Sequence, residues 1–79
     1  MNLQQIFGEI IKQLRSERNL SQEALAFNAY IDRTYISDIE KGKRNISIQV
    51  AFKLAIALEI SFSELIKEIE NHEEYEKLH

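Results

Sequence analysis

Residues 21–42 read SQEALAFNAYIDRTYISDIEKG, and this stretch predicts two short helices in close succession. Ser21 is a good N-cap for a helix over about residues 22–28, because its hydroxyl can accept a hydrogen bond from a backbone N–H of the first turn. Asp32 is the next N-cap candidate, and it opens a second predicted helix over about residues 33–41. Two helices of only a few turns each therefore follow one another in this stretch.

The two predicted helices are separated by only about three residues. A connection this short leaves no room for two antiparallel helices and their side chains, so the helices must cross steeply. Ala26 offers a small side chain at the crossing, and Gly42 suits the left-handed residue that ends the second helix. Helix-turn-helix geometry has this form, with the first residues of the second helix projecting outward.

Three further helices are expected around this pair, and no stretch alternates as a strand does. Ahead of the pair, apolar residues with helical spacing predict a helix over about residues 3–18; they are Leu3, Ile6, Phe7, Ile10, Ile11 and Leu14. Behind the pair, Ser47 caps a predicted helix over about residues 48–59, and Ser61 or Ser63 caps a fifth helix. The sequence thus predicts an all-α fold of five short helices.

The chain has 79 residues, which is enough for one small domain with a marginal core. The five helices occupy residues 1–70, and the acidic stretch over 71–79 is expected to be a tail or the frayed end of a helix. No cysteine is present, and His72 and His79 are spaced unlike metal ligands on a helix face. We therefore expect no metal and no cofactor, and both histidines are expected to be solvated.

Several function classes are disfavoured by what the sequence lacks. No apolar run approaches the ~18 residues of a membrane span, and no export signal opens the chain, so we expect a cytoplasmic protein with no membrane partner. An enzyme is not expected, because cysteine is absent, no histidine lies in the helical body, and Gly42-Lys43 lacks the rest of a phosphate-binding loop. A domain this small has little room for a pocket, so no small-molecule ligand is expected.

Charge is distributed unevenly along the chain. Residues 12–53 carry eight Lys/Arg against five acids, whereas residues 59–79 carry seven acids against two lysines. The difference is +3 for the first segment and -5 for the second, within a total of -3. One face of the protein can therefore meet an anion while the opposite face stays solvated, although a surface with random variation in charge is the alternative.

The segments over 21–26 and 32–42 closely resemble the Cro/C1-type helix-turn-helix family of phage and bacterial regulators, and the resemblance extends from about Gly8 to Ile66. The run DRTYIS over 32–37, followed by Arg44-Asn45, is most similar to the controller proteins of restriction–modification systems. The resemblance implies a lambda-repressor-like fold and a transcriptional regulator that binds double-stranded DNA at a palindromic operator as a homodimer. It further implies a protein encoded by a bacterium or phage and associated with the nucleoid when bound. A phage-type repressor, and an antitoxin or adaptor whose main partner is a protein, are the alternatives.

The resemblance also implies roles for particular residues. The helix that follows Asp32 corresponds to the recognition helix, which lies in the DNA major groove. The expected base contacts are Arg33, Thr34, Ser37 and Arg44, and the expected contacts to the DNA backbone are Gln22, Tyr35, Lys43 and Asn45. For Tyr35, packing at the edge of the core is the alternative.

Two acidic residues of the same segment are expected to make contacts within the protein. Glu40 and Arg15 correspond to a structural ion pair in relatives, which holds the first helix to the third. Asp38 would repel phosphate, so it is expected to be a partner for Arg33 or an element that disfavours wrong sequences.

The helix over 48–59 is too apolar for a surface helix, which points to self-association. One of its faces fills the core, but Ile56 has no evident need to be apolar in a monomer. Together with Phe62, Ile66 and Ile69 it offers an apolar surface that a two-fold symmetric dimer would bury. The alternative is a tightly filled core.

Three positions depart from the pattern of the family, and one of them is Ile46, where the loop often carries proline. Tyr30 and Glu59 stand where a glycine is common. If Tyr30 is left-handed, the strain costs about 1–2 kcal/mol, and otherwise the turn must be remodelled.

Overall fold

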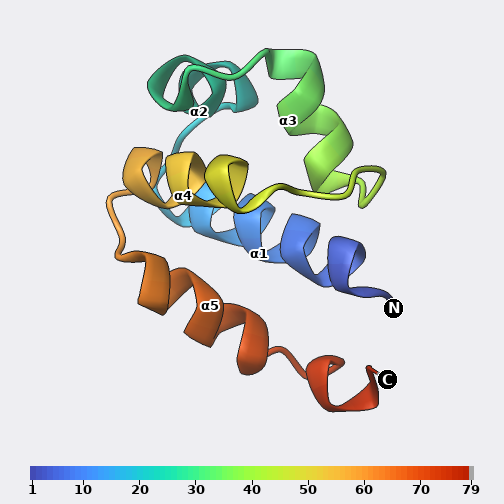
Figure 1. The fold of residues 1–79 in the computed structure, drawn as a ribbon. Helices are drawn as coiled ribbons and strands as arrows, with labels where there is room; N and C mark the ends of the chain where they lie inside the picture. Colours follow the sequence, from blue (N-terminus) through green and yellow to red (C-terminus); the bar gives the residue numbers. More distant parts are fainter. Residues whose placement is uncertain (79) are drawn as a thin grey trace.

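The computed structural model describes residues 1–78 and, within them, five α-helices and a short 3-10 helix. The bounds are α1 Leu3–Glu17, α2 Gln22–Ala29, α3 Arg33–Glu40, α4 Ile48–Ala57, α5 Phe62–Glu70 and η1 Tyr75–Lys77. In Figure 1, α2 and α3 lie on one side of α1 and α4, and α5 lies on the other. The residues described contain no strand, so the prediction of a five-helix, all-α fold is confirmed.

Side chains of short polar residues start every α-helix. Ser21, Ser47 and Ser61 each accept a hydrogen bond from the backbone N–H three residues ahead, and Asp32 accepts one from the Thr34 N–H at 3.3 Å. Ser61, rather than Ser63, is therefore the cap of α5. Asn2 starts α1 through a reciprocal pair of hydrogen bonds with Gln5, a cap that the sequence interpretation overlooked.

Three helices end at residues that are left-handed without being glycine. Asn19, Tyr30 and Glu59 have φ values of 56°, 56° and 59°. The turn between α2 and α3 is thus not remodelled, and Tyr30 adopts the conformation that a glycine would otherwise supply, at a cost of about 1–2 kcal/mol. The helix expected to reach Glu59 ends at Ala57 for the same reason, because a left-handed residue cannot continue it.

The core is formed where α1 packs against α3 and α5, and where α4 packs against α2 and α5. Its fully buried large side chains are Ile6, Ile11, Leu25, Ile36, Ile39, Leu54, Leu58 and Leu65. At Gly8, α1 and α3 are in backbone contact: a Cβ there would overlap the carbonyl oxygen of Ile39 and lie 3.0 Å from that of Glu40. Only glycine allows this approach, which fixes α3 against α1.

The segment that follows α5 folds back on α1, and Figure 1 shows the two chain ends on the same side of the molecule. His72 Nε2 lies 3.1 Å from Glu9 Oε1, and the His72 side chain is only 11% exposed, so the expectation that it is solvated is wrong. Tyr75 and Leu78 pack against the core. His79 lies outside the described residues.

Candidate nucleic-acid interface

The first turn of α3 projects from the fold. Arg33 and Thr34 are exposed, while Ile36 and Ile39 of the same helix are buried against α1 and α2. The Asp32 side chain caps this turn by accepting a hydrogen bond from the Thr34 N–H. Two polar side chains that can donate hydrogen bonds therefore stand at the free end of a helix whose other face is held in the core.

An ion pair anchors α3 from behind. Arg15 Nε lies 2.7 Å from Glu40 Oε2, and Arg15 Nη2 lies 3.0 Å from Glu40 Oε1, with the two side chains 14% and 3% exposed. The hydrogen bonds that Arg15 donates to Glu40 raise the pKa of Arg15 above its ordinary value, against the opposing effect of burial. Arg15 Nη1 also donates to the carbonyl oxygen of Leu20 at 2.8 Å, so one guanidinium ties α1 to α3 and to the loop before α2.

Gln22 belongs to this network as well. Its Nε2 donates to Glu40 Oε1 at 3.0 Å, and the residue is half-buried at the start of α2. The sequence pointed to this side chain only as a contact for phosphate. In the structure, one N–H of the Gln22 amide is bonded to Glu40, and this bond fixes the orientation of the second N–H and of the amide oxygen.

A cluster of three side chains, from α3 and the loop that follows it, lies beside the first turn of α3. Arg44 Nη2 and Nε donate to Asp38 Oδ2 at 3.1 and 3.3 Å, and the Arg44 guanidinium lies 5.0 Å from the centre of the Tyr35 ring. The sequence predicts Asp38 as a partner for Arg33 or as an element that disfavours wrong sequences; its ion-pair partner is Arg44, which the loop after α3 brings within reach. Ser37 is half-buried on the same helix.

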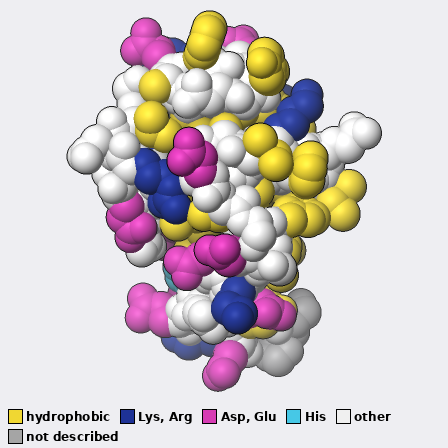
Figure 2. Space-filling model, turned by 90° about the vertical axis from the view of Figure 1, so that its left-hand side faces the viewer, with side chains coloured by type: hydrophobic (Ala, Val, Ile, Leu, Met, Phe, Trp, Pro, Cys, Tyr) yellow, Lys and Arg dark blue, Asp and Glu magenta, His cyan; other side chains and the backbone are white. Residues whose placement is uncertain are grey.

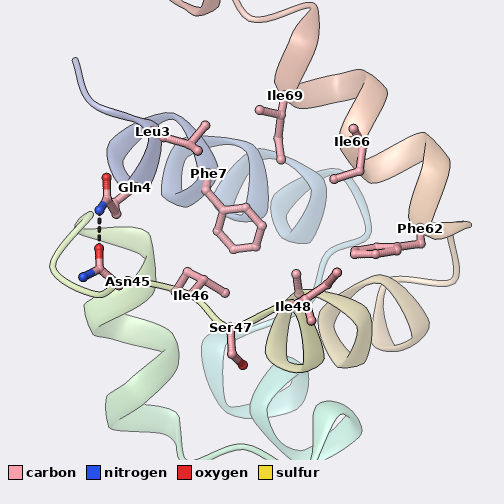
Figure 3. Close-up of a pocket in the computed structure, with 11 residues that line it drawn as sticks. Leu3, Gln4, Phe7, Asn45, Ile46, Ser47, Ile48, Phe62, Ile66 and Ile69 are labelled. Atoms are coloured by element: carbon pink, nitrogen blue, oxygen red, sulfur yellow. Dashed lines mark hydrogen bonds between the residues drawn. The ribbon is translucent and has the colours of Figure 1, made fainter. Parts of the chain in front are cut away.

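The loop over 43–47 exposes two more polar side chains of the predicted set. Lys43 and Asn45 are exposed, and the side-chain oxygen of Asn45 accepts a hydrogen bond from Gln4 on α1 (Figure 3). Three of the predicted DNA-contacting residues are half-buried: Gln22, Tyr35 and Ser37. The others are exposed; they are Arg33, Thr34, Lys43, Arg44 and Asn45.

A second surface, apolar rather than polar, runs along α4 and α5. Ile48, Phe52 and Ile56, spaced four residues apart on α4, are 72%, 51% and 59% exposed, and Ile66 on α5 is 41% exposed. Leu3 on α1 is 51% exposed beside them. We call these five residues the apolar row. Figure 2 shows hydrophobic side chains gathered on one side of the molecule, away from the mixed charges near the C-terminal end.

The residues predicted for a dimer interface divide into two groups. Ile56 and Ile66 are in the apolar row, and Phe62 lies beside it, half-buried with its ring edge-on to Phe52. Ile69 is only 7% exposed and belongs to the core. The sequence alone does not single out the remaining apolar-row residues, Leu3, Ile48 and Phe52, because apolar spacing does not distinguish an exposed position from a core position on these helices.

An open groove of about 500 Å³ lies next to the apolar row, between the start of α1, the loop after α3 and α5 (Figure 3). Its apolar lining comes mainly from Leu3, Phe7, Ile46, Ile48, Phe62, Ile66 and Ile69. The side chains that Figure 3 labels on α5 point toward the groove from one side, and those of α1 from the other. This lining offers no charged group that would orient a small polar ligand.

Neither a cluster of metal ligands nor a membrane-spanning helix is found in residues 1–78. These residues contain no group of three or more potential metal ligands among His, Cys, Asp and Glu. Over the same range, no helix combines the length and apolar character needed to cross a membrane.

Comparison with known proteins places this geometry among helix-turn-helix proteins. The family model HTH_3, described as helix-turn-helix, matches residues 11–65. Control protein C.BamHI of Bacillus amyloliquefaciens is 44% identical over 66 residues, which cover 82% of each chain. The crystal structure of the restriction–modification controller protein C.AhdI from Aeromonas hydrophila has a TM-score of 0.76 and 44% identity, covering 78% of this chain and 94% of that one. The C.Esp1396I controller tetramer in complex with its natural 35 base-pair operator has a TM-score of 0.75 and 41% identity, with 85% and 93% of the chains covered.

Proposed function

Because the chain belongs to the Cro/C1-type helix-turn-helix family and is similar to restriction–modification controller proteins, we propose that it is a transcriptional regulator that binds a two-fold symmetric DNA operator as a homodimer. The observation that carries the proposal is the outward first turn of α3, with Arg33 and Thr34 exposed and the opposite face locked in the core. The family comprises regulators rather than enzymes. We place the protein's action in the cytoplasm, on nucleoid DNA.

In this function α3 enters the major groove and its exposed residues contact base edges. Arg33 presents its guanidinium to guanine O6 and N7, a contact worth about 1–3 kcal/mol of discrimination, and Thr34 meets a thymine methyl or a phosphate. Ser37 and Arg44 complete the proposed base contacts. Gln22, Tyr35, Lys43 and Asn45 are the proposed contacts to the DNA backbone, which fix the register of α3 on the duplex.

The apolar row supplies the proposed dimer interface. Its five side chains are exposed in one chain, and a second copy related by a two-fold axis would cover them with the same surface. Such a pair can place two α3 helices about 34 Å apart, one in each of two successive major grooves on the same side of the duplex. Because the apolar row lies on α1, α4 and α5, this interface would leave the exposed first turn of α3 free to bind DNA in both copies.

Mass in solution tests the dimer. We expect Ile56→Glu to give a monomer with much weaker DNA binding, because the carboxylate would be buried against apolar side chains. Gln13→Glu adds the same charge at an exposed position on α1 and should stay dimeric. Equal sedimentation mass for wild type and Ile56→Glu would remove the apolar row as the interface.

Selection of bound duplexes from a random DNA library, at about physiological salt, tests the function. We expect enrichment of a two-fold symmetric motif with half-sites about 10 bp apart. Enrichment without symmetry would contradict the dimer, and the absence of any enrichment would contradict a DNA-binding regulator.

The second candidate is a module whose main partner is a protein. Phe27 and Tyr30, near the end of α2, are 82% and 90% exposed and lie outside the apolar row. Exposed aromatic side chains of this kind are typical of protein contacts. Two results together would favour this candidate over the first. The selection would enrich no duplex, and affinity capture would recover a protein partner that no longer binds the Phe27→Ser variant.

A further inference from the structure

Asp38 has no role in the functions described so far, and its position is unusual for an acid. It follows Thr34 by four residues on α3, so the two side chains lie on the same side of the helix, one turn apart. Its side chain is 25% exposed. A carboxylate at this place faces a polyanion in the proposed function and opposes binding, unless it is used for something else.

The carboxylate is used to hold Arg44. Both Nη2 and Nε of Arg44 donate to one oxygen, Asp38 Oδ2, and the central carbon of the guanidinium lies over the Tyr35 ring, 5.0 Å from its centre. Arg44 comes from a loop, where its long side chain would otherwise sample many rotamers. One edge of its planar group is thereby held by Asp38, and Tyr35 lies beneath the group.

The remaining hydrogen-bond capacity of Arg44 points to what it can bind. A guanidinium has five N–H donors, and the two that face Asp38 leave the Nη1 pair and one N–H of Nη2. A base edge offers neutral acceptors, to which these N–H groups can donate while the carboxylate stays in place. A phosphate in the same position would bring a second anion close to Asp38 and be repelled.

We propose that Asp38 positions Arg44 for a base edge and withholds it from phosphates, so that Asp38 sets how strongly the protein prefers its operator over random DNA. This inference rests on the proposed function and adds a specificity-determining residue to it. Asp38 touches no base in this role; it acts through Arg44, with Tyr35 as the second support.

Binding of two duplexes by four proteins tests the inference. The duplexes are the one that wild type selects from the random library and a scrambled version of the same composition. The proteins are wild type, Asp38→Asn, Arg44→Ala and the double variant. Glu70→Gln removes one negative charge at an exposed position at the end of α5 and serves as the control for net charge.

For Asp38→Asn we expect binding to the scrambled duplex to tighten about three- to fivefold, the size of effect that a single exposed charge pair has. Binding to the selected duplex should change by less than about twofold, so the preference falls. The dependence of log K on log[salt] for the scrambled duplex should steepen by about two per dimer, because each released Arg44 gains one phosphate. Glu70→Gln should leave the preference unchanged.

The double variant separates positioning from simple charge repulsion. If Asp38 acts through Arg44, Asp38→Asn has no effect on the preference once Arg44 is alanine. An equal effect in both backgrounds would overturn the positioning role, because the carboxylate would then act on phosphate directly. A merely structural role for Asp38 would change the thermal midpoint and affect both duplexes alike, which would also overturn it.

The outcome distinguishes this inference from the proposed function on which it rests. Wild-type protein that enriches no duplex would overturn both. Wild-type protein that discriminates between the two duplexes, with an unchanged ratio in Asp38→Asn, would overturn the role of Asp38 alone.

Discussion

Glu40→Gln is the change that most directly tests how α3 is held. The carboxylate of Glu40 is 3% exposed and accepts two hydrogen bonds from Arg15 and one from Gln22. The substitution keeps the shape of the side chain but removes its charge and one of its two acceptor oxygens. Arg15 is then left partly buried without a counter-charge, although it keeps its hydrogen bond to the Leu20 carbonyl oxygen.

The magnitude follows from this arrangement. Removing one member of a fully buried ion pair costs about 3–5 kcal/mol. This pair is only partly buried, and the amide oxygen that remains still accepts a hydrogen bond, so we expect a loss of about 2–3 kcal/mol. A domain of this size has a free energy of unfolding of only about 4–12 kcal/mol. The thermal midpoint should therefore fall by about 10–20 °C.

Urea unfolding followed by circular dichroism measures the effect. The unfolding midpoint should shift to lower urea with an unchanged slope, because the surface exposed on unfolding is the same. Glu17→Gln is the matched control: Glu17 lies 4.0 Å from Arg18 in an exposed pair, and we expect a change of about 0.5 kcal/mol or less. A loss below about 0.5 kcal/mol for Glu40→Gln would refute the reasoning, since the pair would then behave like a surface pair.

Gly8→Ala should lower the free energy of unfolding by about 2–3 kcal/mol, because the added methyl overlaps the Ile39 carbonyl oxygen. The better helix propensity of alanine does not offset this overlap. Calorimetry measures the change, and a stabilised variant would contradict the close contact. Tyr30→Gly should raise the thermal midpoint by about 2–6 °C, since it removes left-handed strain at an exposed residue, and an unchanged or lower midpoint would show that the tyrosine is not strained. A hydrogen bond from the Lys77 ammonium holds the pKa of Glu74 below its ordinary value, so the stabilisation it gives the C-terminal turn is present above that ordinary value and is lost as pH falls through the lowered one. NMR titration of the Glu74 carboxyl carbon checks this, and a midpoint at or above the ordinary pKa would contradict it.

Local signals in the sequence predicted most of the fold. Ser21, Asp32 and Ser47 marked helix starts because a capping hydroxyl or carboxylate acts within its own first turn. The sequence predicts the end of α4 two residues late, because glutamate itself is no signal for a left-handed residue; only the family's preference for glycine at position 59 points to the helix end. The backbone there follows the packing of Leu58 into the core, which is a long-range effect.

The candidate site was less predictable, because it depends on contacts between distant residues. The apolar row could not be separated from the core by sequence, since α4 is apolar on nearly every side and the pattern has no polar face. Asp38 was assigned the wrong partner because the path of the loop after α3 decides which arginine reaches it. The contact between His72 and Glu9, 63 residues apart, has no local signal at all.

The backbone contact at Gly8 has a consequence for the DNA as well as for the protein. It joins α3 to α1 without flexible side chains between them, and α1 also contributes Leu3 to the apolar row. In the proposed dimer, the distance between the two α3 helices is therefore fixed by the protein. Any mismatch with the half-sites must be absorbed by bending or twisting of the duplex. Base pairs between the half-sites would then be selected for their deformability, although no side chain touches them.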